Sequence, residues 1–212
     1  MTNIEFLKSK NKLIIEKINN NPFIIEIFQG ILPKNKFIKY IKDDYDYIFK
    51  AIKNLNIIAS KARNEKELII LNNLINNAVN SEFQSYYNLI KELNINFEDI
   101  KNYNNSNIMK KYLYHLENSS KKGFQEGIIS AFSCYYSYYS LAKKNINQLS
   151  KNNSSIYKKW CEDLLSIEYK NVIITFENII NDFNDIENMN YYFAKSLNFE
   201  KQIFDHYYEN GE

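Results

Sequence analysis

The chain has 212 residues, of which 45% are hydrophobic and 25% charged, and a formal net charge of +2 at pH 7. Four glycines and two prolines are too few for a turn-dense β-sandwich or barrel, and the sequence has no glycine-rich phosphate loop. Dispersed basic residues disfavour nucleic acid as a partner, and no apolar run approaches the roughly 18 residues of a membrane-spanning helix. We therefore expect a soluble, cytoplasmic protein that forms one domain over residues 1–212.

The first predicted helices begin at prolines. Asn21 before Pro22 is typical of a helix start, with a capping asparagine and a proline at the first helical position. Pro33 opens the next helix in the same way. Over residues 37–59, apolar side chains recur at spacings of three and four, which predicts one long amphipathic helix.

Helical periodicity continues to the end of the chain. A third long helix is predicted over residues 65–93, with Val79 on its apolar face, and residues 94–107 are predicted to form a loop. Gly123 and Gly127 are four apart, which predicts a close crossing between helices. The remaining predicted helices cover residues 106–120, 122–145, 154–183 and 186–208. The sequence therefore predicts an all-α bundle of about seven helices with short connections between mostly antiparallel neighbours.

Three carboxylates occupy positions where the periodicity calls for apolar residues. Asp44 lies on the stripe of the second helix, Glu82 lies between Val79 and Tyr86, and Glu200 lies in the stripe of the last helix. Each one alone has an ordinary explanation, which is a bond to a backbone N–H, a tyrosine or a lysine. Since an unpaired buried charge costs several kcal/mol, three that converge on the bundle interior favour a ligand pocket.

A cysteine belongs to the same pattern. Cys134 and Tyr138 lie one turn apart on one helix face. Most buried cysteines are inert, but interior carboxylates and aromatic neighbours favour a thiol nucleophile served by an acid/base carboxylate. Tyr47 follows Asp44 by three residues, so its ring can lie beside that carboxylate, which suits a flat ligand with N–H donors such as an aminopyrimidine. Cys161 has no such neighbours and is interpreted as structural.

Metal chemistry is disfavoured. His115 and His206 are far apart, and neither completes an ExxH or HExxH spacing. The position four residues after Glu82 is Tyr86, where a di-metal site would place a histidine. No GxSxG motif supports a serine hydrolase.

Five segments occur along nearly the whole chain in a fairly specific order: NPFIIEIFQGILP, KFIKYIKDDYDYIFKAI, GFQEGIISAFSCYYSYY, IYKKW and FAKSLNFEKQIFDHYY. Together they resemble the thiaminase II (TenA) family. The resemblance implies a heme-oxygenase-like helical bundle that hydrolyses thiamin or its aminomethylpyrimidine breakdown product. The product would be hydroxymethylpyrimidine for thiamin salvage. The resemblance also implies that no cofactor is needed and that the chain forms a homotetramer.

The resemblance assigns catalytic roles to residues of this chain. Cys134 matches the active cysteine of the family, and Glu200 matches its acid/base glutamate. Tyr112 matches a pocket tyrosine near the nucleophile, and Tyr138 a tyrosine one turn beyond it. The implied reaction is addition of the Cys134 thiolate to the pyrimidine ring. Glu200 then assists departure of ammonia or the thiazole and acts as base toward water.

Substrate binding is implied for a second set of residues. Asp44 matches the aspartate that binds the amino group and ring nitrogen of the pyrimidine, and Tyr47 matches the stacking aromatic residue. Two positions depart from the family pattern. Leu164 stands where a pocket tyrosine is usual, and a glutamate–histidine pair becomes Glu82 and Tyr86. These departures concern substrate preference and leave the implied catalytic pair intact.

Three alternatives remain open at this point. Leu164 and Tyr86 are compatible with a pyrimidine- or thiamin-binding protein that does not turn its ligand over. A metal-dependent oxygenase shares the implied architecture but lacks its histidine ligands here. A purely structural helical module leaves the interior carboxylates unexplained.

Overall fold

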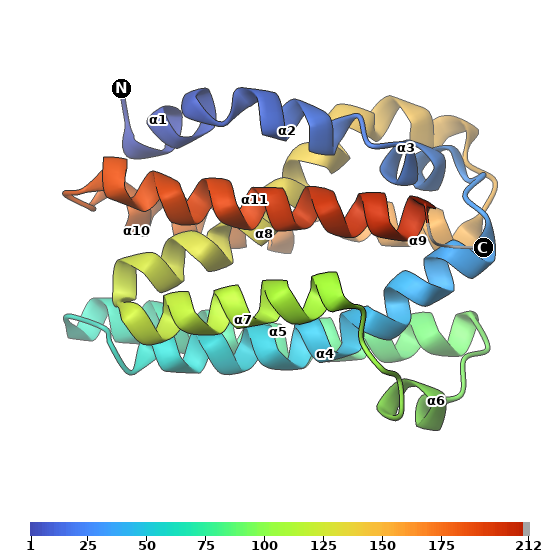
Figure 1. Ribbon diagram of the computed structural model, residues 1–212, viewed down its shortest axis with the longest axis horizontal. Coiled ribbons are helices and arrows are strands. Elements are labelled where there is room, and N and C mark those ends of the chain that lie inside the picture. The colour runs from blue at the N-terminus through green and yellow to red at the C-terminus, as the bar shows by residue number, and fades with distance from the viewer. Residues whose placement is uncertain (210–212) are drawn as a thin grey trace.

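The computed structural model describes residues 1–209, and every regular element in that range is helical. Eleven α-helices and one 3-10 helix succeed one another along this part of the chain (Figure 1). The elements are α1 (Asn3–Lys10), α2 (Lys12–Asn19), α3 (Pro22–Gln29), α4 (Lys34–Ala59), α5 (Glu65–Glu92), α6 (Phe97–Lys101), α7 (Asn107–Lys122), α8 (Phe124–Asn145), η1 (Ile146–Lys151), α9 (Ser155–Asp163), α10 (Ile167–Asn181) and α11 (Ile186–Glu209).

Helix α8 is the central element of the bundle. It contacts α2, α4, α7, α10 and α11. In Figure 1, α4, α5 and α7 form the lower layer, and α11 runs across the middle with α1 and α2 above it. Antiparallel α4 and α5 pack against each other over much of their length. The predicted all-α bundle is confirmed.

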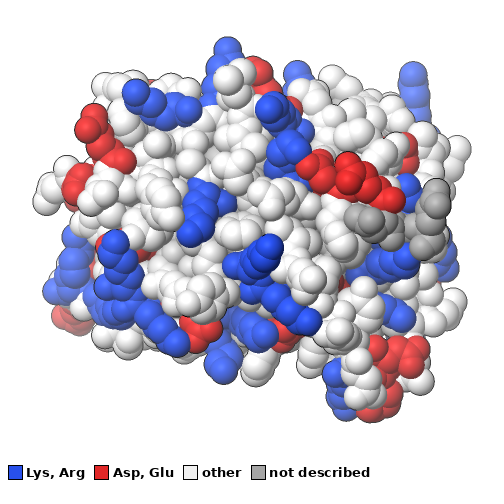
Figure 2. Space-filling view, viewed as in Figure 1, with Lys and Arg blue, Asp and Glu red and all other residues white. Residues whose placement is uncertain are grey.

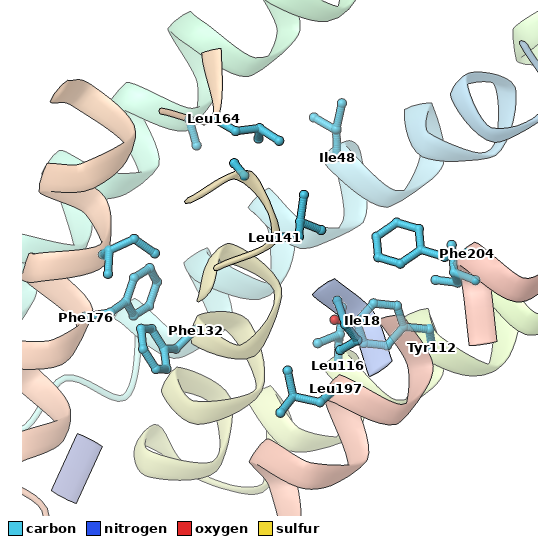
Figure 3. Packing of buried hydrophobic residues seen from close by; sticks show 14 of the residues in the cluster. Ile18, Ile48, Tyr112, Leu116, Phe132, Leu141, Leu164, Phe176, Leu197 and Phe204 are labelled. Carbon is cyan, nitrogen blue, oxygen red and sulfur yellow. The ribbon is translucent and has the colours of Figure 1, made fainter. Parts of the chain in front are cut away.

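The core is built from large apolar side chains of nearly every long helix. Phe132, Phe176, Phe193 and Phe204 are fully buried, and rings from α8, α10 and α11 contact one another within this core. Figure 3 shows several of these side chains at close range, including Phe132 of α8 and Phe176 of α10. Burial of each such ring contributes roughly 2–3 kcal/mol to folding, so packing rather than helix propensity stabilises these asparagine-rich helices.

Capping explains where several helices begin. The Asn21 side chain accepts a hydrogen bond from the Phe23 amide at 3.0 Å, and Pro22 occupies the first turn of α3, as predicted. Pro33 stands one residue before α4. In α1, Thr2 and Glu5 form a reciprocal capping box that satisfies two amides of the first turn.

The predicted number of helices was too low. The segment before Asn21 forms α1 and α2, which the prediction left unassigned, and the predicted loop over residues 94–107 contains the short helix α6. The predicted helix over residues 154–183 is two helices, because the Ser166 side chain caps a new start by accepting a hydrogen bond from the Tyr169 amide.

Two finer predictions have opposite outcomes. Val79 is 43% exposed, so it does not belong to the apolar face of α5. Gly127 confirms the predicted close crossing. A Cβ there would lie 2.5 Å from a side-chain atom of Ile58 and 3.1 Å from the backbone of Ser120, so α8 approaches both α4 and α7 where it has no side chain.

The charged surface is mixed. On the face seen in Figure 2, Lys and Arg side chains form several separate groups with Asp and Glu side chains among them. No helix within residues 1–209 is both long and apolar enough to cross a membrane. Cytoplasmic location, the homotetramer and the absence of nucleic acid as a partner stay predictions.

Candidate functional site

A cavity of about 790 Å³ lies between α4, α5, α7, α8, α9 and α10. This volume falls in the roughly 300–1,000 Å³ range of pockets that hold drug-sized ligands. Helix α4 forms one long wall, since Tyr40, Asp44, Tyr47, Ala51 and Asn54 recur along it at spacings of three and four. The cavity therefore follows α4 for about 20 Å.

Two carboxylates face this cavity from adjacent helices. The pKa of Asp44 is raised well above its usual range by burial, and Glu82, Glu200 and Asp43 raise it further through like charge. Glu82 accepts a hydrogen bond from the Tyr135 hydroxyl at 3.0 Å, yet burial still raises its pKa. Burial therefore makes the ionised form of both carboxyl groups unfavourable. A ligand that brings N–H donors or positive charge would offset this free-energy cost.

The nucleophile candidate lies on the opposite wall. Cys134 of α8 lines the cavity and is 9% exposed. Its thiol makes hydrogen-bonding contacts with the side chains of Tyr47 and Glu200. Burial, followed by the nearby Glu200 carboxylate, raises the pKa of the thiol well above its usual value. The sulfur is therefore protonated at neutral pH, and it needs a base to become a thiolate.

Glu200 supplies such a base from behind the cavity wall. It is 1% exposed and does not line the cavity. The Tyr112 hydroxyl donates a hydrogen bond to Glu200 Oε1 at 2.7 Å. Burial raises the pKa of Glu200 to about 7, although the bonds from Tyr112 and Cys134 oppose this rise. At neutral pH this carboxylate is poised to accept or return the thiol proton.

Tyr47, the second neighbour of the Cys134 thiol, belongs to a stack of three aromatic rings. Tyr47 stacks on Tyr112 with ring centroids 5.6 Å apart, and Tyr112 stacks on Phe199 at 5.3 Å. Tyr112 is fully buried, so the stack is fixed from the core side. It holds the Tyr47 ring beside Cys134 at the cavity wall.

An aromatic group closes one end of the cavity. The hydroxyls of Tyr40 and Tyr138 are hydrogen-bonded at 2.7 Å. Trp160 of α9 meets both rings edge-on, with centroids 6.4 Å from Tyr40 and 6.1 Å from Tyr138. These rings give the Asp44 end of the cavity flat, apolar surfaces against which a heterocycle can pack.

The two departures from the family pattern also reach the cavity. Tyr86 lines it, but its hydroxyl donates to the Ile41 carbonyl at 2.8 Å and so ties α5 to α4. Leu164 lines it at the end of α9 and contributes only apolar surface. Neither residue contributes a titratable group near neutral pH.

The predicted site residues therefore come together in two sets. Tyr112 and Glu200 lie directly behind the wall and contact residues that line it. Seven residues line the cavity itself, namely Asp44, Tyr47, Glu82, Tyr86, Cys134, Tyr138 and Leu164.

Sequence reasoning missed several cavity residues. Tyr40 lies one turn before Asp44, and Tyr135 follows Cys134 directly, so both positions carried a usable signal. Tyr169 and Trp160 reach the cavity from two helices that were predicted as one, so their convergence was not visible.

The histidines do not form a metal site. His115 is buried, and its Nε2 is hydrogen-bonded to Ser196 Oγ at 3.0 Å while its ring packs against Phe199. Within residues 1–209, no three His, Cys, Asp or Glu side chains gather in a way that could hold a metal ion. The oxygenase alternative thus lacks a ligand set in the described part of the chain.

Comparison with known proteins finds relatives and solved structures that match along nearly the whole chain. An aminopyrimidine aminohydrolase of Helicobacter pylori is 24% identical over 199 residues, which cover 90% of this chain and 91% of that protein. A TenA homologue of P. horikoshii OT3 is 25% identical and superposes with a TM-score of 0.94 over the whole of both chains.

A domain of unknown function from Shewanella denitrificans, described as having a heme oxygenase-like fold, superposes with a TM-score of 0.80 at 14% identity. The match covers 98% of this chain and 92% of that one. This likeness confirms the predicted heme-oxygenase-like fold. The model of the TENA/THI-4/PQQC family matches residues 8–210. The chain therefore belongs to the TENA/THI-4/PQQC family, as its sequence segments predicted.

Proposed function

We propose that this protein is an aminopyrimidine aminohydrolase that hydrolyses aminomethylpyrimidine or thiamin to hydroxymethylpyrimidine and so serves thiamin salvage. The observation that carries the proposal is the contact between the Cys134 thiol and the Glu200 carboxylate at a cavity wall, with the Asp44 carboxyl across from them. The relatives named aminopyrimidine aminohydrolase support the same reaction class.

Asp44 is suited to bind the pyrimidine edge. Burial and the nearby carboxylates raise its pKa, which favours the neutral, protonated carboxyl. A neutral carboxyl can donate one hydrogen bond to a ring nitrogen and accept another from the adjacent amino group. The Tyr47 ring beside it offers a face for the heterocycle. The pair therefore orients an aminopyrimidine with its exocyclic methylene toward Cys134.

Glu200 starts the reaction by taking the thiol proton. The Cys134 thiolate then adds to a pyrimidine ring carbon, and the displaced electron pair expels the leaving group from the methylene. A protonated amine leaves as neutral ammonia and a thiazolium leaves as neutral thiazole, so neither needs the proton from Glu200 that the family resemblance implies. Glu200 therefore keeps the thiol proton during this step and is not the base toward water. Water next adds to the methylene and loses a proton to solvent. The carbon–sulfur bond breaks, and Glu200 returns its proton to the sulfur.

The charge of the cavity fits cationic substrates. Glu92, Asp163 and Glu168 also line it, and the ammonium of Lys159 is paired with Glu92 at 3.0 Å. An excess of carboxylates attracts a protonated amine or a thiazolium and loses that interaction once the neutral leaving group has departed.

The decisive experiment is turnover by the purified protein, with hydroxymethylpyrimidine measured by chromatography after incubation with aminomethylpyrimidine and, separately, with thiamin. Replacing Cys134 by alanine should lower turnover by about 10³-fold or more while pyrimidine binding persists. Cys161→Ala is the matched control, because that cysteine is fully buried and does not line the cavity. Full activity of C134A would end the nucleophile assignment.

The same assay separates the main alternative. If neither substrate yields product and hydroxymethylpyrimidine still binds saturably in calorimetry, the protein is a pyrimidine-binding protein. Leu164 would then account for the loss, since it adds only apolar surface where the family pattern has a tyrosine.

A further inference from the structure

One carboxylate of the cavity takes no part in the reaction steps of Cys134 and Glu200. Glu82 of α5 lines the cavity and is only partly buried, so a small molecule in the cavity can reach it. Its Oε1 accepts a hydrogen bond from the Tyr135 hydroxyl at 3.0 Å, and no side chain within residues 1–209 donates to its Oε2. This second oxygen keeps accessible surface and is open to the cavity.

Glu82 lies level with Asp44 of the neighbouring helix. The Tyr86 hydroxyl donates to the Ile41 carbonyl at 2.8 Å, which sets the register of antiparallel α4 and α5. Glu82 lies one turn before Tyr86, about 6 Å back along α5, and Asp44 lies about 4.5 Å forward along α4 from Ile41. Because the two helices run in opposite directions, both steps lead to the same level. After burial, the charge of Glu82 is the next cause that raises the pKa of Asp44.

The bond to Tyr135 also brings Glu82 close to the nucleophile. Tyr135 follows Cys134 directly in α8 and lines the cavity. Its ring packs against Phe176 with centroids 5.4 Å apart, and the Tyr169 hydroxyl donates to its carbonyl at 3.3 Å. The Tyr135 side chain is therefore held in place, and its hydroxyl orients the carboxylate of Glu82. The carboxylate faces the part of the cavity that Cys134 also lines.

Small side chains leave room for a water molecule beside this carboxylate. Ala78 lies one turn before Glu82 on α5, Ala131 lies one turn before Tyr135 on α8, and both line the cavity. A water molecule occupies about 30 Å³, and Glu82 Oε2 can accept one of its hydrogen bonds. The cavity can therefore hold a water on Glu82 together with a bound ring.

The attack of water needs a base that the other carboxyl groups do not supply. Glu200 holds the thiol proton at this stage, and Asp44 is engaged with the pyrimidine edge. The other lining residues that carry a carboxylate are exposed, namely Glu92, Asp163 and Glu168. Burial raises the pKa of Glu82, although its hydrogen bond opposes the rise, so Glu82 is a stronger base than an exposed glutamate.

We propose that Glu82 is the general base that activates the water which releases the product from Cys134. This proposal rests on the proposed function and adds a catalytic residue to it. Glu82 Oε2 accepts a proton of the water while the water oxygen forms a bond to the methylene carbon. The electron pair of the exocyclic double bond moves into the ring and expels the Cys134 thiolate, which takes its proton back from Glu200. Protonated Glu82 then loses its proton to solvent.

The test separates departure of the leaving group from attack of water in the full-length protein. Glu82→Gln keeps the side-chain size and can still accept the Tyr135 hydrogen bond, but it cannot take a proton. With whichever substrate the wild-type protein turns over, we expect kcat to fall by about 10²- to 10³-fold. In rapid mixing, one equivalent of the leaving group should still depart at nearly the wild-type rate. Intact-protein mass spectrometry should then find the methylene-pyrimidine bound to Cys134.

Azide makes the test specific to the loss of a base. Azide is an anion that attacks the methylene without losing a proton. It should therefore speed turnover by Glu82→Gln about 10-fold or more and give azidomethylpyrimidine. Tyr135→Phe removes the bond that orients Glu82, so it should slow the same step by about 3- to 10-fold and should also respond to azide.

Glu65→Gln is the matched control, because Glu65 is exposed on the same helix and does not line the cavity. It should keep wild-type rates and should not respond to azide.

Each outcome decides the proposal. Release of one equivalent, a bound methylene-pyrimidine and rescue by azide in Glu82→Gln support Glu82 as the base. Wild-type turnover by this variant, a slow variant that releases no first equivalent, or one that azide does not rescue overturns the role of Glu82 while the proposed function stands. If the wild-type protein forms no hydroxymethylpyrimidine, the proposed function fails and the role of Glu82 fails with it.

Discussion

Two adjacent carboxylates on opposite faces of α4 lie in opposite environments. Asp43 is fully buried and accepts hydrogen bonds from the Ser106 amide at 3.1 Å, from the Ser106 hydroxyl and from the Tyr207 hydroxyl. Asp44, one residue later, faces the cavity, where burial and neighbouring carboxylates raise its pKa and no described neighbour lowers it.

This difference separates structure from function. The Asp43 carboxylate fixes the start of α7 against α4 and α11, and its hydrogen bonds repay the cost of burial. The Asp44 carboxyl is held at a cost that only a ligand can offset. Glu200 of α11 combines both kinds of environment. It accepts a hydrogen bond from the buried Tyr112 hydroxyl, and it contacts Cys134, which lines the cavity.

The largest expected effect concerns Glu200 as a base. Because its pKa is raised to about 7, the carboxylate is protonated below that pH and cannot take the thiol proton. We expect kcat/KM to fall about tenfold per pH unit below pH 7, and Glu200→Gln to lower kcat by about 10²- to 10⁴-fold. A pH profile of both proteins checks this, and a wild-type profile flat from pH 5 to 8 would contradict it.

The next effect separates the two aspartates directly. Asp44→Leu should weaken pyrimidine binding by about 10- to 100-fold, because leucine can neither donate nor accept a hydrogen bond, and should leave the melting temperature unchanged or higher, because it removes a carboxyl that burial disfavours. Asp43→Ala should instead cost about 3 kcal/mol of folding free energy, since the Ser106 and Tyr207 donors lose their partner. For both variants, calorimetry measures pyrimidine binding and urea unfolding measures the free energy of folding. If Asp44→Leu proves as destabilising as Asp43→Ala, the contrast between the two faces is wrong.

A smaller effect concerns how the burial of Glu200 makes folding stability depend on pH. Its folded-state pKa of about 7 lies above the usual 4.5, so the folded state binds more protons and stability declines as pH rises from about 4.5 to 7. At pH 8, burial of the ionised Glu200 lowers the free energy of unfolding by up to about 3 kcal/mol. Glu200→Gln should recover part of it at pH 8 and little at pH 5, where wild-type Glu200 is already neutral. Thermal unfolding at both pH values checks the sign, and an equal shift at both would contradict it.

Much of this contrast was visible in the sequence, but not all of it. Helical spacing places Asp44, Cys134 and Glu200 toward the bundle interior, and the structure brings them together. The structural role of Asp43 depends on Ser106, which is 63 residues away, so no local pattern predicts it. Asparagine is abundant throughout this chain, so a single asparagine is a weak capping signal, and the start of α6 after Asn96 was missed for that reason.

The position of Trp160 makes the cavity observable by its own fluorescence. It is the only tryptophan in the chain, and its ring meets Tyr40 and Tyr138 at one end of the cavity. An arriving heterocycle would displace solvent beside a single emitting indole, so the emission would report occupancy without any label. Stopped-flow recording of that signal would time ligand entry separately from bond breaking, because the optical change reflects contact with the indole and not chemistry at the sulfur.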